Sequence, residues 1–182
     1  MRYVSLDLET TSLHPGNGQI LEIGAVVDDL SNPLPLDQLS VYHKYVTNKD
    51  MIIIGELQSI AMNGGIFKSI VDNLGTDLVI DENELSVDFE NWLVHQKISK
   101  VTFGGKNFGM FDSKFLDRLP GWDDVNYSHR ALDVGSMYVT KEDEQIPNLS
   151  QCLERANLPS KVLHTAVEDA MQVIQLVRHK LL

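Results

Sequence analysis

The order of strand-like and helix-like segments predicts an α/β domain built around a mixed β-sheet. Three strand-like segments come first along the 182-residue chain, and helices alternating with shorter strands follow them. No proline- or glycine-rich linker divides the sequence, so we expect residues 1–182 to form a single domain. Hydrophobic residues make up 43% of the chain and charged residues 23%, which is typical of a globular protein and excludes wholesale disorder.

The first part of the chain predicts three strands. Residues 2–9 alternate in polarity, so that one face is apolar and the other carries polar and acidic side chains. The turn-forming run 14–18 leads into an apolar, β-branched segment at residues 19–27, and the two segments therefore predict a hairpin. Residues 28–37 contain two prolines and predict a loop, and residues 39–46 alternate well enough for a third strand.

The remaining residues predict helices separated by short strands. The clearest helix follows Asp81, which with Glu84 forms a candidate capping box before apolar residues at helical spacing. The run Asn63-Gly64-Gly65 separates the first two short helices. The elements expected are helices at 56–62 and 66–73, the helix after Asp81, a strand at 99–103, a helix at 109–119, a strand at 131–134, and helices at 148–156 and 166–182.

The net charge argues against a protein that grips long nucleic acid. Twenty-six acidic residues against 15 lysines and arginines leave a formal net charge of −11, whereas such proteins usually present a basic surface. The acids can serve as a solubilising surface, and some of them can be gathered to hold metal cations. Both interpretations stay open at this point.

The sequence also predicts a protein without a membrane segment. No apolar run approaches the roughly 18 residues that a spanning helix needs, and acids occupy the N-terminal stretch where a signal peptide would be apolar. The single cysteine, Cys152, can form neither an internal disulfide nor a CxxC metal site. We therefore expect a reducing, cytoplasmic location.

Three places in the chain carry ionisable side chains in settings that suit chemistry. Asp7 and Glu9 point from the same face of a strand, roughly 6.5–7 Å apart. A divalent cation between them would offset their repulsion. The alternative is an exposed edge strand on which both acids face water. Asp112 follows a glycine-rich exit from a strand, and it also suits the first turn of a helix. His164 and Asp169 can converge only if His164 lies in a loop and Asp169 in the following helix; otherwise His164 is a surface or capping residue.

Taken jointly, these motifs resemble the DEDD 3′→5′ exonucleases, in the branch with a histidine in the last motif (DEDDh). The matching motifs are residues 6–13 with 20–25, residues 107–116, and residues 164–169. The resemblance covers residues 3–30 and 98–180. It implies a ribonuclease H-like mixed sheet, with its first three strands antiparallel, flanked by helices. Within the family, residues 105–112 and 129–134 look like oligoribonuclease.

The resemblance assigns the catalytic roles. Asp7, Glu9, Asp112 and Asp169 would ligate two divalent metal ions, Mg²⁺ or Mn²⁺, and His164 would be the general base that activates the attacking water. The implied reaction is hydrolysis of the 3′-terminal phosphodiester of single-stranded DNA or RNA, with release of nucleoside 5′-monophosphates. The expected partners are therefore single-stranded 3′ ends.

The resemblance also implies a set of substrate-binding residues. Thr10 would hold the terminal sugar, Leu13 would wedge against the last base, and Asn107 would support the site. Met62 stands where relatives place an apolar residue beside a histidine, which is Asn63 here. Stacking or wedging on Leu13, Met62 or Phe108 would hold the strand with little sequence preference. The acid Asp133 is either a residue that orients a ligand or an ordinary strand-end residue.

Several alternatives stay open on sequence grounds. The enzyme could be oligoribonuclease-like and act on short RNA, or it could hydrolyse small phosphodiesters through the same metals. A non-catalytic nucleic-acid-binding module that keeps the exonuclease fold is a further alternative. The sequence does not distinguish DNA from RNA, and a homodimer or a recruiting protein partner is compatible with the acidic charge.

Overall fold

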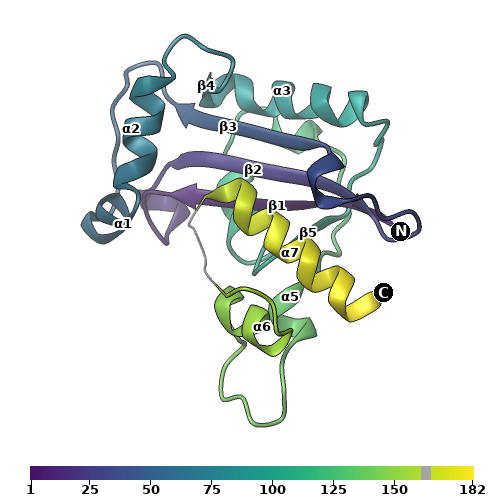
Figure 1. Ribbon diagram of the computed structural model, residues 1–182. Coiled ribbons are helices and arrows are strands. Elements are labelled where there is room, and N and C mark those ends of the chain that lie inside the picture. The colour runs from purple at the N-terminus through teal and green to yellow at the C-terminus, as the bar shows by residue number, and fades with distance from the viewer. Residues whose placement is uncertain (161–164) are drawn as a thin grey trace.

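The computed structural model describes residues 1–160 and 165–182, and it confirms the predicted mixed α/β architecture (Figure 1). A six-stranded sheet has the order β4-β3-β2-β1-β5-β6. β2 pairs antiparallel with β1 and β3, whereas the pairs β1–β5, β5–β6 and β3–β4 are parallel. The first three strands are thus antiparallel, as expected. The strands are β1 (Arg2–Thr10), β2 (Ile20–Asp29), β3 (Val41–Thr47), β4 (Val79–Asp81), β5 (Phe103–Gly105) and β6 (Leu132–Asp133).

Helices cover both faces of this sheet (Figure 1). On one face, the apolar side of β1 packs into a cluster with Leu85 and Phe89 of α3. On the other face, Tyr3 and Val26 pack with helices α5, α6 and α7. The helices are α1 (Leu57–Met62), α2 (Gly64–Asp72), α3 (Glu82–His95), α4 (Asp112–Leu116), α5 (Val134–Met137), α6 (Leu149–Arg155) and α7 (Ala166–Leu181). Within the described residues, no helix has the length and apolar character needed to cross a membrane.

The alternation in β1 decides which residues meet which helix. Val4, Leu6 and Leu8 are buried on the α3 side, and burial of each such side chain contributes roughly 1.5–3 kcal/mol. Successive side chains point to opposite faces, so the polar residues of β1 point toward α7. Ser5 lies on that polar face, and its hydroxyl donates a hydrogen bond of 2.8 Å to the carbonyl of Ala170 in α7.

α7 lies across β1 and β2 and is anchored at its far end by an ion pair (Figure 1). Arg178 donates from Nη2 to Oδ1 of Asp28 at 2.5 Å and from Nε to Oδ2 at 3.1 Å. The hydroxyl of Tyr3 also donates to Asp28, which is almost fully buried. The apolar residues Ala166, Ala170, Val173 and Val177 on one stripe of α7 are buried, and Leu181 at the end of the stripe is half exposed. The paired carboxylate and guanidinium therefore fix the C-terminal half of α7 on β2.

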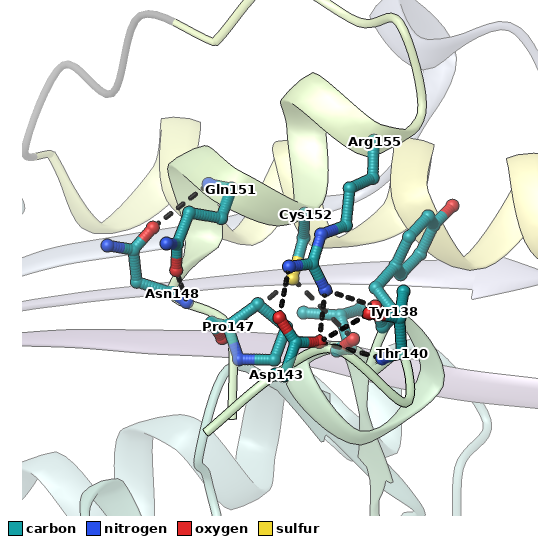
Figure 2. Close-up of polar contacts among 9 residues, drawn as sticks. Tyr138, Thr140, Asp143, Pro147, Asn148, Gln151, Cys152 and Arg155 are labelled. Carbon is teal, nitrogen blue, oxygen red and sulfur yellow. Dashed lines mark hydrogen bonds and ion pairs between the residues drawn. The ribbon is translucent and has the colours of Figure 1, made fainter. Parts of the chain in front are cut away.

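A second polar cluster fixes α6 (Figure 2). Arg155 donates two hydrogen bonds to the carboxylate of Asp143, at 2.5 and 2.7 Å, and a third to the carbonyl of Tyr138. These bonds hold the pKa of Asp143 well below its usual range. At the start of α6, Asn148 and Gln151 form a capping box. These hydrogen bonds therefore hold the loop between α5 and α6 against α6.

Several predicted boundaries are wrong in informative ways. β4 was not expected, and it pairs with β3 at the sheet edge. The strand predicted at 99–103 begins only at Phe103, because Val101 forms a single bridge to Tyr127. The carboxylate of Asp81 does cap α3, but it accepts from the backbone N–H of Asn83 instead of that of Glu84.

Two helices also differ from their predicted spans. The helix expected at 109–119 is only α4, because residues 107–111 form a turn in which Asn107 has a left-handed φ of 67°. The backbone N–H groups of Met110 and Phe111 both donate to the carbonyl of Asn107. Of the predicted separator 63–65, only Asn63 lies between α1 and α2, since Gly64 and Gly65 form the first turn of α2. Propensity alone misplaces these ends because hydrogen bonding within the turn decides them.

Candidate metal centre

Three of the predicted acids come together where β1 ends and α7 begins. Asp7 and Glu9 lie on the β1 face that points toward α7, and Asp169 lies in the first turn of α7. One carboxylate oxygen from each residue lies within 4.8 Å of the others. Asp7 and Glu9 are partly exposed, and Asp169 is buried. These three residues are called the acid cluster below.

A glycine in β2 permits the close approach of α7. Gly24 pairs with Asp7 across the ladder. A Cβ atom at this position would lie 2.3 Å from the backbone carbon of Ala166 and the backbone nitrogen of Val167. Any larger residue would displace the first turn of α7 from the sheet. The distance of Asp169 from Asp7 and Glu9 therefore depends on Gly24, which lies about 140 positions earlier in the chain.

Asp112 joins the acid cluster electrostatically from a third segment. It is the first residue of α4 and is only 2% exposed. Burial raises its pKa, while hydrogen bonds from the backbone N–H groups of Asp112 itself and Leu8 lower it. After burial, the charge of Asp112 is the largest cause that raises the pKa of Asp7. The four acids named by the sequence therefore interact around the end of β1.

The electrostatics of the acid cluster favour a cation. Burial, followed by the charges of Asp112, Asp169 and Glu9, raises the pKa of Asp7 well above its usual range. Burial and the charge of Asp169 raise the pKa of Glu9 to about 7. Carboxylate oxygens are the ligands that Mg²⁺ and Mn²⁺ prefer. The donor set therefore fits a hard divalent cation, which would offset the repulsion among these groups.

His164 lies outside the described residues, so its predicted role stays a prediction. The described part begins again at Thr165, and α7 starts at Ala166. Asp169 therefore lies within the helix, as convergence with His164 requires. Thr165 donates its hydroxyl to the carboxylate of Glu168 at 2.7 Å.

The predicted substrate residues at the end of β1 have mixed positions. Leu13 and Met62 are 69% and 66% exposed, so both can contact a ligand. Thr10 is buried, and its hydroxyl donates to the carbonyl of Ser12, so its side chain is engaged within its own loop. Asn63 is buried and donates from Nδ2 to the carbonyl of Thr10 at 2.9 Å. It therefore supports the loop instead of presenting its side chain to a nucleotide.

The loop between β5 and α4 corrects one substrate assignment. Phe108 was expected to stack on a base, but it is buried and stacks on Phe103 with ring centroids 4.5 Å apart. The neighbouring Met110 is instead 77% exposed, a position that the sequence did not single out. The backbone N–H of Asn107 donates to Oδ2 of Asp133 at 2.6 Å, and Oδ1 of Asp133 caps α5. Asp133 thus holds the loop that carries Asp112.

The fold resembles solved nuclease structures at low sequence identity. Cell-death related nuclease 4 (CRN-4) matches with a TM-score of 0.67 and 15% identity, over 97% of this chain and 62% of that chain. E. coli Exonuclease I in complex with a dT13 oligonucleotide matches with a TM-score of 0.66 and 14% identity, over 97% of this chain and 40% of that one. An ExoI/SSB-Ct complex matches with a TM-score of 0.63 and 12% identity, over 99% of this chain and 41% of that chain. The chain thus spans less than two thirds of these proteins.

The sequence itself also defines the family. The model of the exonuclease family, RNase_T, matches residues 4–177. No curated protein sequence is significantly similar to the chain. The chain belongs to the exonuclease family, of the DEDD type, and it has a ribonuclease H-like fold.

Proposed function

We propose that this protein is a DEDDh-type 3′→5′ exonuclease that removes nucleoside 5′-monophosphates from the 3′ end of single-stranded DNA or RNA. The observation that carries the proposal is the acid cluster, in which carboxylate oxygens of three residues lie within 4.8 Å of one another. The cluster occurs at the end of a central strand, in a chain of the exonuclease family. Three acids in this space are costly unless a cation is bound among them.

The proposed chemistry follows from the side chains present. Asp7, Glu9, Asp112 and Asp169 would hold two divalent ions, Mg²⁺ or Mn²⁺. Such a pair stabilises both the attacking and the leaving oxygen of an in-line displacement at phosphorus. His164 would take the proton of the attacking water, which in this family is the task of the last motif. Without metal, the carboxylates would repel the anionic phosphate oxygens of the substrate.

Exposed apolar side chains in the segments next to the proposed site support binding of an unpaired strand end. Leu13, Met62 and Met110 are each more than 60% exposed and come from three separate segments. Apolar and aromatic surfaces hold bases with little sequence preference. Exonuclease I has been solved in complex with dT13 and dA16 oligonucleotides, which supports a single-stranded substrate here.

The charge of −11 bears on substrate length and partners. A strongly acidic protein gains little from counterion release on a long polymer. We therefore propose that the substrates are short oligonucleotides, or long strands delivered by a recruiting protein. In the oligoribonuclease-like alternative, the substrate is short RNA. A homodimer and a cytoplasmic location are kept as predictions, as is a single domain over residues 1–182.

A gel assay tests the proposal directly. Single-stranded DNA and RNA labelled at the 5′ end are incubated with the protein and Mg²⁺ or Mn²⁺. A ladder that shortens from the 3′ end supports the proposal, and the faster substrate identifies the preferred sugar. Asp7→Asn should remove the ladder, and Asp123→Asn, at an exposed acid outside the acid cluster, should keep it. Intact substrate with wild-type protein and either metal would refute the exonuclease assignment.

A further inference from the structure

Glu22 on β2 is a buried acid that the proposed metal ligands do not include. It is 2% exposed and interrupts the apolar run of residues 20–27 in β2. Its partner across the ladder is Glu9. The charge of Glu22 is one of the causes that raise the pKa values of Glu9 and Asp7. A fifth acid in this place makes the repulsion worse, so its presence requires a structural reason.

Both carboxylate oxygens of Glu22 are bound by groups from other elements. Oε1 lies 2.7 Å from Nε2 of His43 on β3. Oε2 accepts a hydrogen bond of 3.3 Å from the backbone N–H of Ala166, the first residue of α7. The ring of His43 in turn packs edge-on against Tyr45, with centroids 4.8 Å apart. His43 thus holds Glu22 in the orientation that reaches α7.

The bond to Ala166 replaces the cap that α7 does not supply for itself. Within the described residues, the N-cap Thr165 makes no side-chain cap hydrogen bond, and its hydroxyl donates to Glu168 instead. The first N–H groups of a helix need acceptors, and a carboxylate there also interacts favourably with the helix dipole. Glu22 provides this acceptor from the neighbouring strand. Asp169 lies three residues after Ala166, in the same first turn.

We propose that Glu22, held by His43, is a positioning residue that seats the first turn of α7 on β2 and so places Asp169 in the acid cluster. The inference rests on the proposed function, because it assumes that Asp169 is a metal ligand. Gly24 contributes the close approach, and Glu22 contributes the directional bond. An alternative role, in which Glu22 itself ligates metal, makes the opposite predictions for two conservative substitutions.

Substitutions of Glu22 separate these roles through the affinity of the full-length protein for Mn²⁺, measured by isothermal titration calorimetry. Glu22→Gln keeps an oxygen for the N–H of Ala166 and a group that can hydrogen-bond His43, but it loses the charge. Glu22→Asp keeps the charge and shortens the side chain by one methylene, so it cannot span both partners. Positioning predicts near wild-type affinity for E22Q and a loss of about 10–100-fold for E22D. Ligation predicts the reverse order.

Two further variants complete the test. Glu22→Ala and His43→Ala should both lower Mn²⁺ affinity, and in any oligonucleotide assay they should lower kcat while KM changes little. Glu90→Ala is the control, since it removes an exposed acid of α3 outside the site and should leave affinity unchanged. If E22A does not fold, the comparison of E22Q with E22D still decides the question.

The outcomes distinguish this inference from the proposed function. Wild-type protein that binds Mn²⁺ but leaves every nucleic acid intact would contradict the exonuclease proposal, whereas the affinity series would still test Glu22. Equal affinities for E22Q, E22D and wild type, or a loss in E22Q as large as in E22D, would overturn the positioning role.

Discussion

Replacement of Glu9 by glutamine should stabilise the metal-free protein at neutral and basic pH. Glu9 has an ordinary pKa of 4.5, which burial and the charges of Asp169 and Glu22 raise to about 7 in the fold. Between these two values the folded chain binds a proton more tightly than the unfolded chain does. Stability of the metal-free protein therefore falls as pH rises from about 4.5 to about 7, and the loss is complete above that range.

The size of the effect follows from the same two values. A rise in pKa from 4.5 to about 7 corresponds to about 3 kcal/mol of unfavourable interaction at pH 8, and to less than about 1 kcal/mol at pH 5. Glu9→Gln keeps the shape of the side chain and removes the charge. For a chain of 182 residues, about 3 kcal/mol raises the melting temperature by about 6–12 °C.

The assay is thermal unfolding of wild type and E9Q in EDTA at pH 5 and pH 8. E9Q should melt higher at pH 8, and the difference should shrink to a few degrees or less at pH 5. Excess Mn²⁺ should stabilise wild type more than E9Q, since binding to the folded state alone raises stability. Glu90→Gln, at an exposed glutamate of α3, serves as the control. A melting temperature of E9Q at pH 8 equal to or below that of wild type would refute the electrostatic reasoning.

Three further outcomes are expected. Asp7→Asn should abolish nuclease turnover without unfolding the protein, because it removes one of several mutually repelling acids, and circular dichroism with the gel assay checks both; substantial turnover would contradict the metal assignment. His164→Ala should retain Mn²⁺ binding but lose about 10²–10⁴-fold in rate, and an unchanged pH–rate profile would remove His164 from its role. Arg178→Ala should destabilise the fold by about 3–5 kcal/mol in urea unfolding, because it leaves Asp28 buried without its cation, and a change below about 1 kcal/mol would show that α7 does not depend on this pair.

Some parts of the site were open to prediction from sequence because they depend on local geometry. The alternation in β1 placed Asp7 and Glu9 on one face, opposite the apolar residues that pack against α3. The spacing after His164 placed Asp169 inside a helix. Each of these statements needs only the periodicity of one element.

Other parts were not open to prediction because they depend on which way a loop turns. Phe108 was predicted to bind the substrate. After the left-handed turn at Asn107, however, the ring of Phe108 lies in the core and Met110 lies at the surface. Asn63 likewise turns inward to the carbonyl of Thr10. A lone acid in the apolar run of β2 was the one sequence signal for Glu22, and its partners lie on two other elements.

The sequence by itself determined the class of fold, the strand face that carries the first two acids and the family motifs, because these follow from short-range periodicity and from residue order. Only the tertiary structure decided that the start of α7 meets that face. This contact joins residues about 140 positions apart through the bare backbone at Gly24 and the hydrogen bond that the N–H of Ala166 donates to Glu22. A contact of this kind depends on packing between elements, and no local pattern of residues encodes it.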